Sequence, residues 1–204
     1  MADRYDSFAT LAANEIEGVD YRIRVTERAS PIAIIAPHGG LIERATSEVA
    51  AAIAADRFSF YCFEGLTQAS GGRLHITSMR FDEPRALRLV SASEVAIGVH
   101  GRKDQGNKEF IWVGGLHESL RDAICEALAR SGFKAKLVGE GHRLAGRDPA
   151  NICNRGRFGA GVQLELPHAL RMRFTNDSLY QDAFTEAVRT AIGDEESNFV
   201  PSIA

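Results

Sequence analysis

Short apolar runs alternate with segments of helical periodicity along most of the chain. Strands buried on both faces of a sheet appear as continuous apolar runs, and residues 32–36 form such a run. Runs of this kind, or runs with period-two alternation, predict strands at 21–26, 32–36, 58–63, 73–78, 95–99, 110–113, 134–138 and 162–166. Apolar residues at helical spacing predict helices at about 46–55, 84–92, 117–131 and 178–192.

Local signals mark several helix ends and indicate the fold class. Thr46 or Ser47 is expected to cap the first helix, and Gly132 to end the third. Strands that alternate with helices predict an α/β fold, with an open, mixed but largely parallel sheet flanked by helices. No repeat or linker divides the sequence, so residues 1–204 are expected to form a single domain.

Composition narrows the class of protein without naming a function. The chain has 204 residues, 45% of them hydrophobic and 25% charged, as is usual for globular proteins. No apolar run approaches the roughly 20 residues that a membrane helix needs. The polar start of the chain, residues 1–6, lacks the features of a secretory signal. We therefore expect a cytoplasmic protein with no membrane partner.

Charge and cysteine content exclude further classes. With a net charge of −3 the chain has no general attraction for phosphate backbones, so no nucleic-acid partner is expected. Arginines in several segments still leave room for a local anionic-substrate pocket. Cys62, Cys125 and Cys153 form no Cys-x-x-Cys pair and are predicted to be reduced thiols. Phosphate-loop, dinucleotide-binding and serine-nucleophile motifs are absent from the sequence.

Two histidines follow buried runs directly. His38 comes after residues 32–36 and is followed by two glycines that leave space around its ring, while His100 ends the run 95–99. Ligand sites in such sheets gather beyond the carboxyl ends of strands, so both imidazoles are expected at one edge. Glu43 lies five residues after His38 and is able to fold back toward it.

Two imidazoles and one carboxylate, with a fourth position left to water, are the ligand set of hydrolytic zinc sites. His38, Glu43 and His100 therefore predict a Zn²⁺ site that activates water. The alternative is that each histidine only closes its strand with a hydrogen bond.

Glu165 is the candidate general base. Alternation in residues 161–167 puts Gln163 and Glu165 on one face and apolar residues on the other. A carboxylate in so apolar a strand is costly to bury without a partner, which a metal-activated water or an arginine would supply. The alternative is an edge strand with a solvated polar face.

Asn154 and Arg155 precede that strand in a long irregular segment. A guanidinium matches a carboxylate in a planar fork, so the pair is a candidate for holding an acidic substrate; the alternative is an ordinary surface arginine. Among the other histidines, His75 is a reserve ligand on a predicted strand. His117 fits a helix start, and His142 and His168 are expected on the surface.

Five segments taken in order resemble the phage-type poly-γ-glutamate hydrolase family, which is similar to the zinc carboxypeptidases. They are 36–43 with 46–48, 74–78, 98–101, 151–155 and 161–166. The resemblance implies a carboxypeptidase-like sheet, His38, Glu43 and His100 as zinc ligands, Glu165 as base and proton shuttle, and Asn154 with Arg155 on a substrate carboxylate. In the carboxypeptidases the first histidine and glutamate are closer together than here.

The resemblance implies hydrolysis of γ-glutamyl bonds in an anionic, peptide-like substrate. A zinc deacylase of N-acyl amino acids or aminoacyl esters would use the same metal and base. A non-catalytic, phage-associated binding module is the alternative from another class. If a phage encodes the chain, lysis would release it from the cell.

Overall fold

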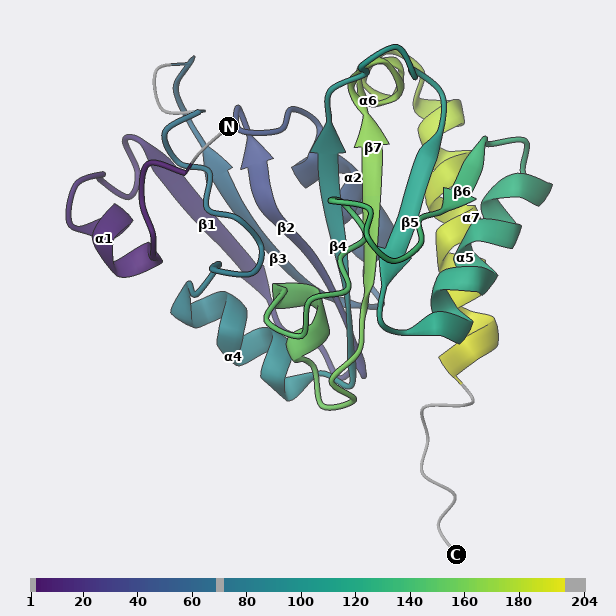
Figure 1. The fold of residues 1–204 in the computed structure, drawn as a ribbon, viewed down its shortest axis with the longest axis horizontal. Helices are drawn as coiled ribbons and strands as arrows, with labels where there is room; N and C mark the ends of the chain where they lie inside the picture. The colour runs from purple at the N-terminus through teal and green to yellow at the C-terminus, as the bar shows by residue number, and fades with distance from the viewer. Residues whose placement is uncertain (1–2, 69–71, 197–204) are drawn as a thin grey trace, which may run out of the picture.

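Seven strands form one mixed sheet in the computed structural model, which describes residues 3–68 and 72–196. The strands are β1 (Tyr21–Thr26), β2 (Ile32–Gly40), β3 (Ser59–Gly65), β4 (Val95–Arg102), β5 (Ile111–Gly115), β6 (Ala135–Leu137) and β7 (Val162–Pro167). Their order across the sheet is β1-β3-β2-β4-β7-β5-β6 (Figure 1). Strands β3, β2, β4 and β7 are parallel, β1 is antiparallel to β3, and β5 is antiparallel to β7 and parallel to β6. The predicted open, largely parallel sheet is therefore confirmed.

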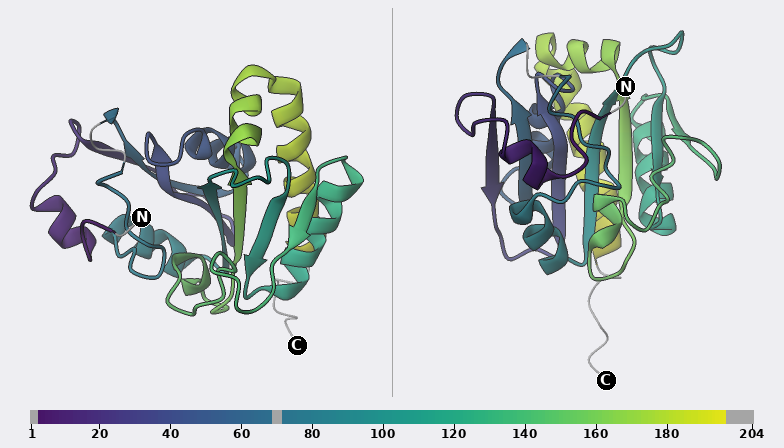
Figure 2. Two further views of the ribbon diagram at one scale, coloured as in Figure 1. Left: turned by 45° about the horizontal axis from the view of Figure 1, so that its top comes forward. Right: turned by 60° about the vertical axis from the view of Figure 1, so that its left-hand side comes forward.

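Helices cover both faces of this sheet (Figure 2). They are α1 (Phe8–Ala12), α2 (Thr46–Ala54), α4 (Pro84–Ala92), α5 (Glu118–Arg130), the 3-10 helix η1 (Ile152–Arg155), α6 (His168–Asn176) and α7 (Ser178–Glu196). Helices α2, α5, α6 and α7 pack in one core layer, and α1, α4 and η1 contribute to the other. Because both faces are buried, the central strands consist almost entirely of buried residues.

The sequence pattern predicted seven of the eight proposed strands and all four proposed helices, with ends shifted by a few residues. The strand expected at 73–78 is wrong. Leu74 and Ile76 are buried as the alternation suggests, but they pack into the core from a loop that pairs with no strand of the described chain. Helices α1 and α6 were not predicted.

The expected cap of α2 is also wrong. Ala45 occupies the N-cap position in a left-handed conformation, with φ 70°, and makes no side-chain cap. The Thr46 hydroxyl instead donates to the carbonyl oxygen of Glu43 at 2.8 Å, and the Ser47 hydroxyl accepts from the Gly40 N–H at 3.0 Å. Both hydroxyls therefore stabilise the turn that precedes the helix.

An extra residue in β2 decides the direction of His38. Ala36 pairs with Cys62 of β3, and three residues later Gly39 pairs with Glu64, which is only two residues further along β3. Side chains alternate between the faces of a strand, so an inserted residue moves everything after it to the opposite face. Without this bulge, His38 would share the face of Ala36 and point toward α2.

The bulge falls at Pro37 and His38. Proline has no N–H to donate to a sheet ladder, so a bulge is one of the few places inside a sheet where it fits. His38 is consequently buried on the face opposite α2, where its ring makes an edge contact with Phe81 and its Nε2 bonds the carbonyl oxygen of Ile76 at 2.8 Å.

The glycines after His38 serve packing rather than space around the imidazole. A Cβ on Gly39 would lie 2.1 Å from the Ser47 hydroxyl, and a Cβ on Gly40 would lie 2.4 Å from the carbonyl oxygen of Gly65. Gly40 also has a φ of 60°, which favours glycine. These residues let the end of β2 approach α2 and β3 closely.

Two further expectations concern the cysteines and the membrane. Cys62 and Cys153 are buried and Cys125 is half-buried, and all three are free thiols as predicted. Across residues 3–68 and 72–196, no helix has both the length and the apolar character that spanning a membrane requires.

Candidate metal centre

Three adjacent parallel strands bring the predicted chemistry to one edge of the sheet. His38 lies near the carboxyl end of β2, His100 near that of β4, and Glu165 near that of β7. His100 and Glu165 are direct register partners across β4 and β7. All three side chains are at most 5% exposed and line one cavity of about 790 Å³.

Glu43 completes a compact group with the two histidines. His38 Nδ1 lies 3.2 Å from His100 Nδ1 and 3.4 Å from Glu43 Oε1, and His100 Nδ1 lies 3.7 Å from Glu43 Oε2. Donors at about 2.0–2.2 Å around a tetrahedral zinc are spaced by roughly 3.3–3.6 Å. The three side chains therefore come close to the spacing of zinc ligands, with a different oxygen of Glu43 facing each histidine.

Hydrogen bonds on the side facing away from this group determine which of its atoms are available to bind a metal. A carbonyl oxygen accepts only, so His38 Nε2 carries the proton toward Ile76 and leaves Nδ1 as a lone pair in the neutral ring. The Gly101 N–H donates to Glu43 Oε2 at 2.7 Å and fixes that carboxylate. The inward lone pair of His38, the fixed Glu43 carboxylate and the adjacent Nδ1 of His100 together suit a divalent cation.

The two carboxylates near the centre have opposite pKa shifts. Burial alone raises the pKa of Glu43, but the positive charge and the hydrogen bonds that His38 and His100 supply when their rings are protonated hold it well below its ordinary range. Burial, with the nearby charge of Glu43, raises the pKa of Glu165 to about 8. Glu43 thus stays ionised, as a metal ligand does, and Glu165 is able to exchange a proton near neutral pH.

Glu165 lies in the interior of the sheet, so the edge-strand alternative is wrong. Strand β7 pairs with β4 on one side and β5 on the other. Glu165 Oε1 accepts from Gln163 Nε2 at 2.9 Å, and Gln163 Oε1 in turn accepts from Asn151 Nδ2 at 2.8 Å. The carboxylate is therefore held by a chain of amides.

Basic side chains also line the cavity. Arg102 is buried, and its guanidinium lies 4.0 Å from the centroid of the Trp112 ring and donates to main-chain carbonyls. Lys103 and Arg143 are exposed in the cavity wall, and Arg143 bonds the neutral side chain of Gln105 at 3.2 Å. The cavity therefore presents positive charge to an occupant.

The structure does not bring Asn154 and Arg155 to this cavity. The Asn154 amide donates to the carbonyl oxygens of Gly146 and Asp148 and accepts from the Gly161 N–H. Arg155 bonds the carbonyl oxygens of two residues in the loop before α4, Met79 and Phe81. Both side chains tie irregular backbone segments together, so this arrangement does not support their expected role on a substrate carboxylate.

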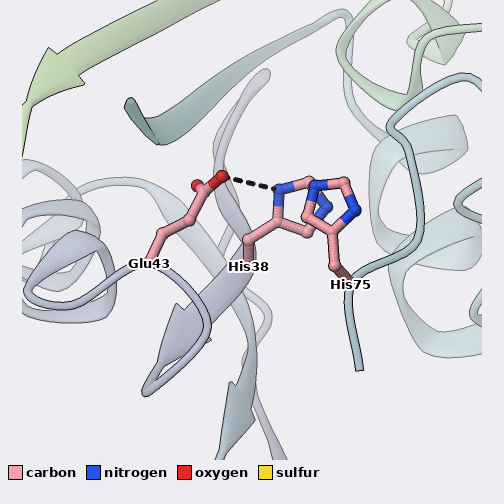
Figure 3. A group of neighbouring side chains, drawn as sticks. All are labelled: His38, Glu43 and His75. Carbon is pink, nitrogen blue, oxygen red and sulfur yellow. Dashed lines mark ion pairs between the residues drawn. The ribbon is translucent and has the colours of Figure 1, made fainter. Parts of the chain in front are cut away.

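The remaining histidines divide into two groups. His117 caps α5 by accepting from the Leu120 N–H, and His168 is exposed at the start of α6. His142, which was expected on the surface, lines the cavity and packs edge-on against Trp112. His75 also lines the cavity and stacks on His38 (Figure 3). Lys103, His142 and Arg143 lie in loops, where periodicity gives no signal, so the sequence did not identify them as cavity residues.

Comparison with known proteins identifies the same family that the sequence motifs resemble. Residues 5–192 match the family described as poly-gamma-glutamate hydrolase. The SPbeta prophage-derived UPF0714 protein YoqZ of Bacillus subtilis strain 168 is 39% identical over 175 residues, which are 86% of this chain and 62% of YoqZ. UPF0714 protein YndL of the same strain is 39% identical over 169 residues, which are 83% of this chain and 66% of YndL. The chain thus spans less than two thirds of the length of both relatives.

Solved structures agree with the observed fold. A bacteriophage poly-gamma-glutamate hydrolase superposes with a TM-score of 0.91 at 33% identity, over 97% of this chain and 100% of that one. A structure described as "YNDL-apo (Zinc-free)" gives 0.87 at 34% identity, over 95% and 99%. A Burkholderia mallei protein whose description names a carboxypeptidase gives 0.52 at 11% identity, over 88% and 60%, and is similar in fold alone.

Proposed function

Because the chain belongs to the poly-γ-glutamate hydrolase family, we propose that it is a zinc-dependent hydrolase that cleaves γ-glutamyl amide bonds. The family membership confirms the resemblance found in the sequence. The observation that carries the proposal is the convergence of two imidazole nitrogens and a carboxylate at 3.2–3.7 Å, beside a buried glutamate.

His38, Glu43 and His100 are proposed to hold the zinc ion. The donor spacing, the lone pair on His38 Nδ1 and the fixed Glu43 carboxylate support this assignment. The relative described as zinc-free supports zinc over other divalent cations. Zinc in such a site lowers the pKa of water to near 7 and polarises a carbonyl oxygen.

Glu165 is proposed to be the general base and then the general acid. It accepts the proton of the attacking water and passes it to the leaving amine nitrogen, so it ends each cycle ionised again. Its location on the strand next to His100 and its raised pKa support this role, since proton exchange is efficient when the pKa lies near the working pH. Gln163 and the amide chain behind it hold the carboxylate in place.

The substrate is proposed to be anionic along its length. Each γ-linked glutamate carries a free carboxylate, and Lys103 and Arg143 lie in the cavity wall without a carboxylate partner in the described chain. Arg147 is a weaker candidate, because it already pairs with Glu118 and Glu140. We therefore assign carboxylate binding to Lys103 and Arg143 in place of Asn154 and Arg155.

The proposal is tested by assaying γ-linked and α-linked oligoglutamate before and after chelation, and again after Zn²⁺ is added back. We expect cleavage of the γ-linked chain, loss of cleavage after chelation and recovery with zinc. Full activity in the stripped protein would contradict the zinc mechanism. Cleavage of N-acyl amino acids or aminoacyl esters alone would favour the deacylase, and zinc binding without hydrolysis of any of these would favour a binding module.

A further inference from the structure

His75 lies beside the metal centre but has no role in the mechanism above. Its ring stacks on that of His38 with centroids 4.2 Å apart and an interplanar angle of 29°. One ligand atom from each of His38, Glu43 and His75 lies within 4.8 Å of the other two (Figure 3). A third imidazole therefore has a ring nitrogen close to two of the proposed ligands.

Asp3 determines which nitrogen of His75 is available. Asp3 Oδ1 lies 2.7 Å from His75 Nδ1, and the Asp3 side chain is only 1% exposed. Its Oδ2 accepts from the Thr77 N–H at 2.8 Å and from the Arg80 guanidinium. A carboxylate held by an arginine and a backbone N–H accepts hydrogen bonds only, so His75 Nδ1 donates and Nε2 keeps a lone pair.

This arrangement repeats the carboxylate–histidine pattern found behind metal ligands. In that pattern a carboxylate accepts from one ring nitrogen, orients the ring and makes the other nitrogen a better donor. Nothing in the hydrolytic mechanism requires so well buried a partner for His75. A cation at the centre would explain the Asp3–His75 pair, because a metal ligand must be a neutral and oriented imidazole.

On the basis of the proposed metal site, we propose that His75 Nε2 is a fourth protein donor to the cation held by His38, Glu43 and His100. The present separation exceeds the donor spacing around a tetrahedral zinc, about 3.4 Å, by at most about 1.4 Å. Movement of the segment that carries His75 by that amount would bring Nε2 to donor spacing. His75 lies in a loop rather than a strand, so its movement disturbs no sheet ladder.

A fourth donor changes how the protein retains its cation. With His75 engaged, the substrate-free centre has four protein ligands, as structural zinc sites do. For hydrolysis, His75 would have to withdraw to the cavity wall so that water and the substrate could reach the cation. The consequence is tight retention of the metal between turnovers.

The test is Co²⁺ binding to the chelator-stripped protein, followed by visible absorption, which reports on the number and kind of donors. His75→Phe keeps the stacked ring and removes both nitrogens; His75→Asn is a second variant, and Asp3→Asn removes the orienting charge. His168→Asn is the matched control, at an exposed histidine. Loss of an orienting partner typically weakens metal affinity about 10- to 100-fold, and we expect at least that loss for both His75 variants.

The outcomes separate this inference from the proposed function. Weaker Co²⁺ binding and an altered spectrum in the His75 variants, with His168→Asn unchanged, would support the fourth donor. If the wild type binds Co²⁺ and both His75 variants bind it equally well with the same spectrum, His75 is not a donor although the three-ligand site stands. If the wild type binds no Co²⁺, the proposed metal site fails and this inference with it.

Discussion

Gln163 donates from its side-chain Nε2 to Oε1 of Glu165, two residues away on the same face of β7. The same Nε2 also approaches the carbonyl oxygen of Leu144 at 3.4 Å, and a Cβ on Gly146 would lie 2.8 Å from the Gln163 Cβ. Gln163 thus joins the proposed base to the loop that forms the far wall of the cavity.

We expect Gln163→Leu to lower kcat about 10- to 100-fold, because Glu165 loses the donor that orients it. KM should change less than kcat, since Gln163 bonds the proposed base at 2.9 Å and reaches the cavity loop only through a longer contact with the Leu144 carbonyl oxygen at 3.4 Å. Steady-state kinetics on γ-linked oligoglutamate separates the two constants. Gln181→Leu on α7 is the control. A rise in KM with unchanged kcat would show that Gln163 binds substrate instead of positioning Glu165.

Glu165→Gln should retain zinc and lose turnover. The amide is isosteric but unable to accept the proton, and general acid–base catalysis contributes about 10²- to 10⁴-fold to such reactions. Metal analysis of the purified variant, together with its turnover, checks both parts. Turnover within a few-fold of the wild type would remove Glu165 from the mechanism.

Glu165 should also make the metal-free protein less stable as the pH rises. Its pKa is about 8 in the folded chain and near 4.5 in the unfolded chain. The unfolded state therefore releases this proton first, and the free energy of unfolding falls between about pH 4.5 and pH 8, by an amount on the order of several kcal/mol. Urea unfolding of stripped wild type and Glu165→Gln from pH 5 to 9 measures the difference. Parallel curves would contradict the buried, protonated carboxyl.

Lys103→Gln and Arg143→Gln should each raise KM for γ-linked chains about 3- to 10-fold, with a smaller effect on kcat, because each loses an exposed charge contact. The double variant should also show a weaker dependence of KM on salt. Arg130→Gln, on the exposed surface of α5, is the control. If neither variant changes KM, the substrate carboxylates bind elsewhere.

Arg171 connects three backbone segments beside the metal centre. Its buried guanidinium donates to the carbonyl oxygens of Leu166, Arg102 and Arg44. Arg171→Met keeps the length of the side chain but leaves these acceptors unpaired, and we expect the free energy of unfolding to fall by about 2–5 kcal/mol. Urea unfolding measures it, with Arg173→Met on the exposed side of α6 as the control. A loss no larger than in that control would show that water replaces the guanidinium.

Local patterns were sufficient for most of the fold. Continuous apolar runs predicted the parallel strands because the sheet is buried on both faces. The rule that sites gather at strand ends then paired His38 with His100, which are 62 residues apart in the sequence. The failure at 73–78 has a physical reason as well: alternation reports burial of Leu74 and Ile76, but a strand also needs a neighbour.

The far wall of the cavity was not predictable in this way. Lys103 and Arg143 lie in loops whose positions depend on long-range packing, such as the contact between Gly146 and Gln163. Asn154 and Arg155 attracted a functional interpretation because of their residue types. Their partners are main-chain carbonyls of other irregular segments, and a sequence does not show which carbonyls need a donor.

The bulge at Pro37 and His38 has a meaning beyond local geometry. A regular β2 would pair with β3 without interruption and would direct the histidine toward α2, so the bulge gives up regular sheet pairing at this point. Its effect is on the site: it places His38 on the face of the sheet where His100 and Glu165 lie. A designer who removed the bulge would obtain a regular strand but would lose the metal centre, because His38 would then point toward α2.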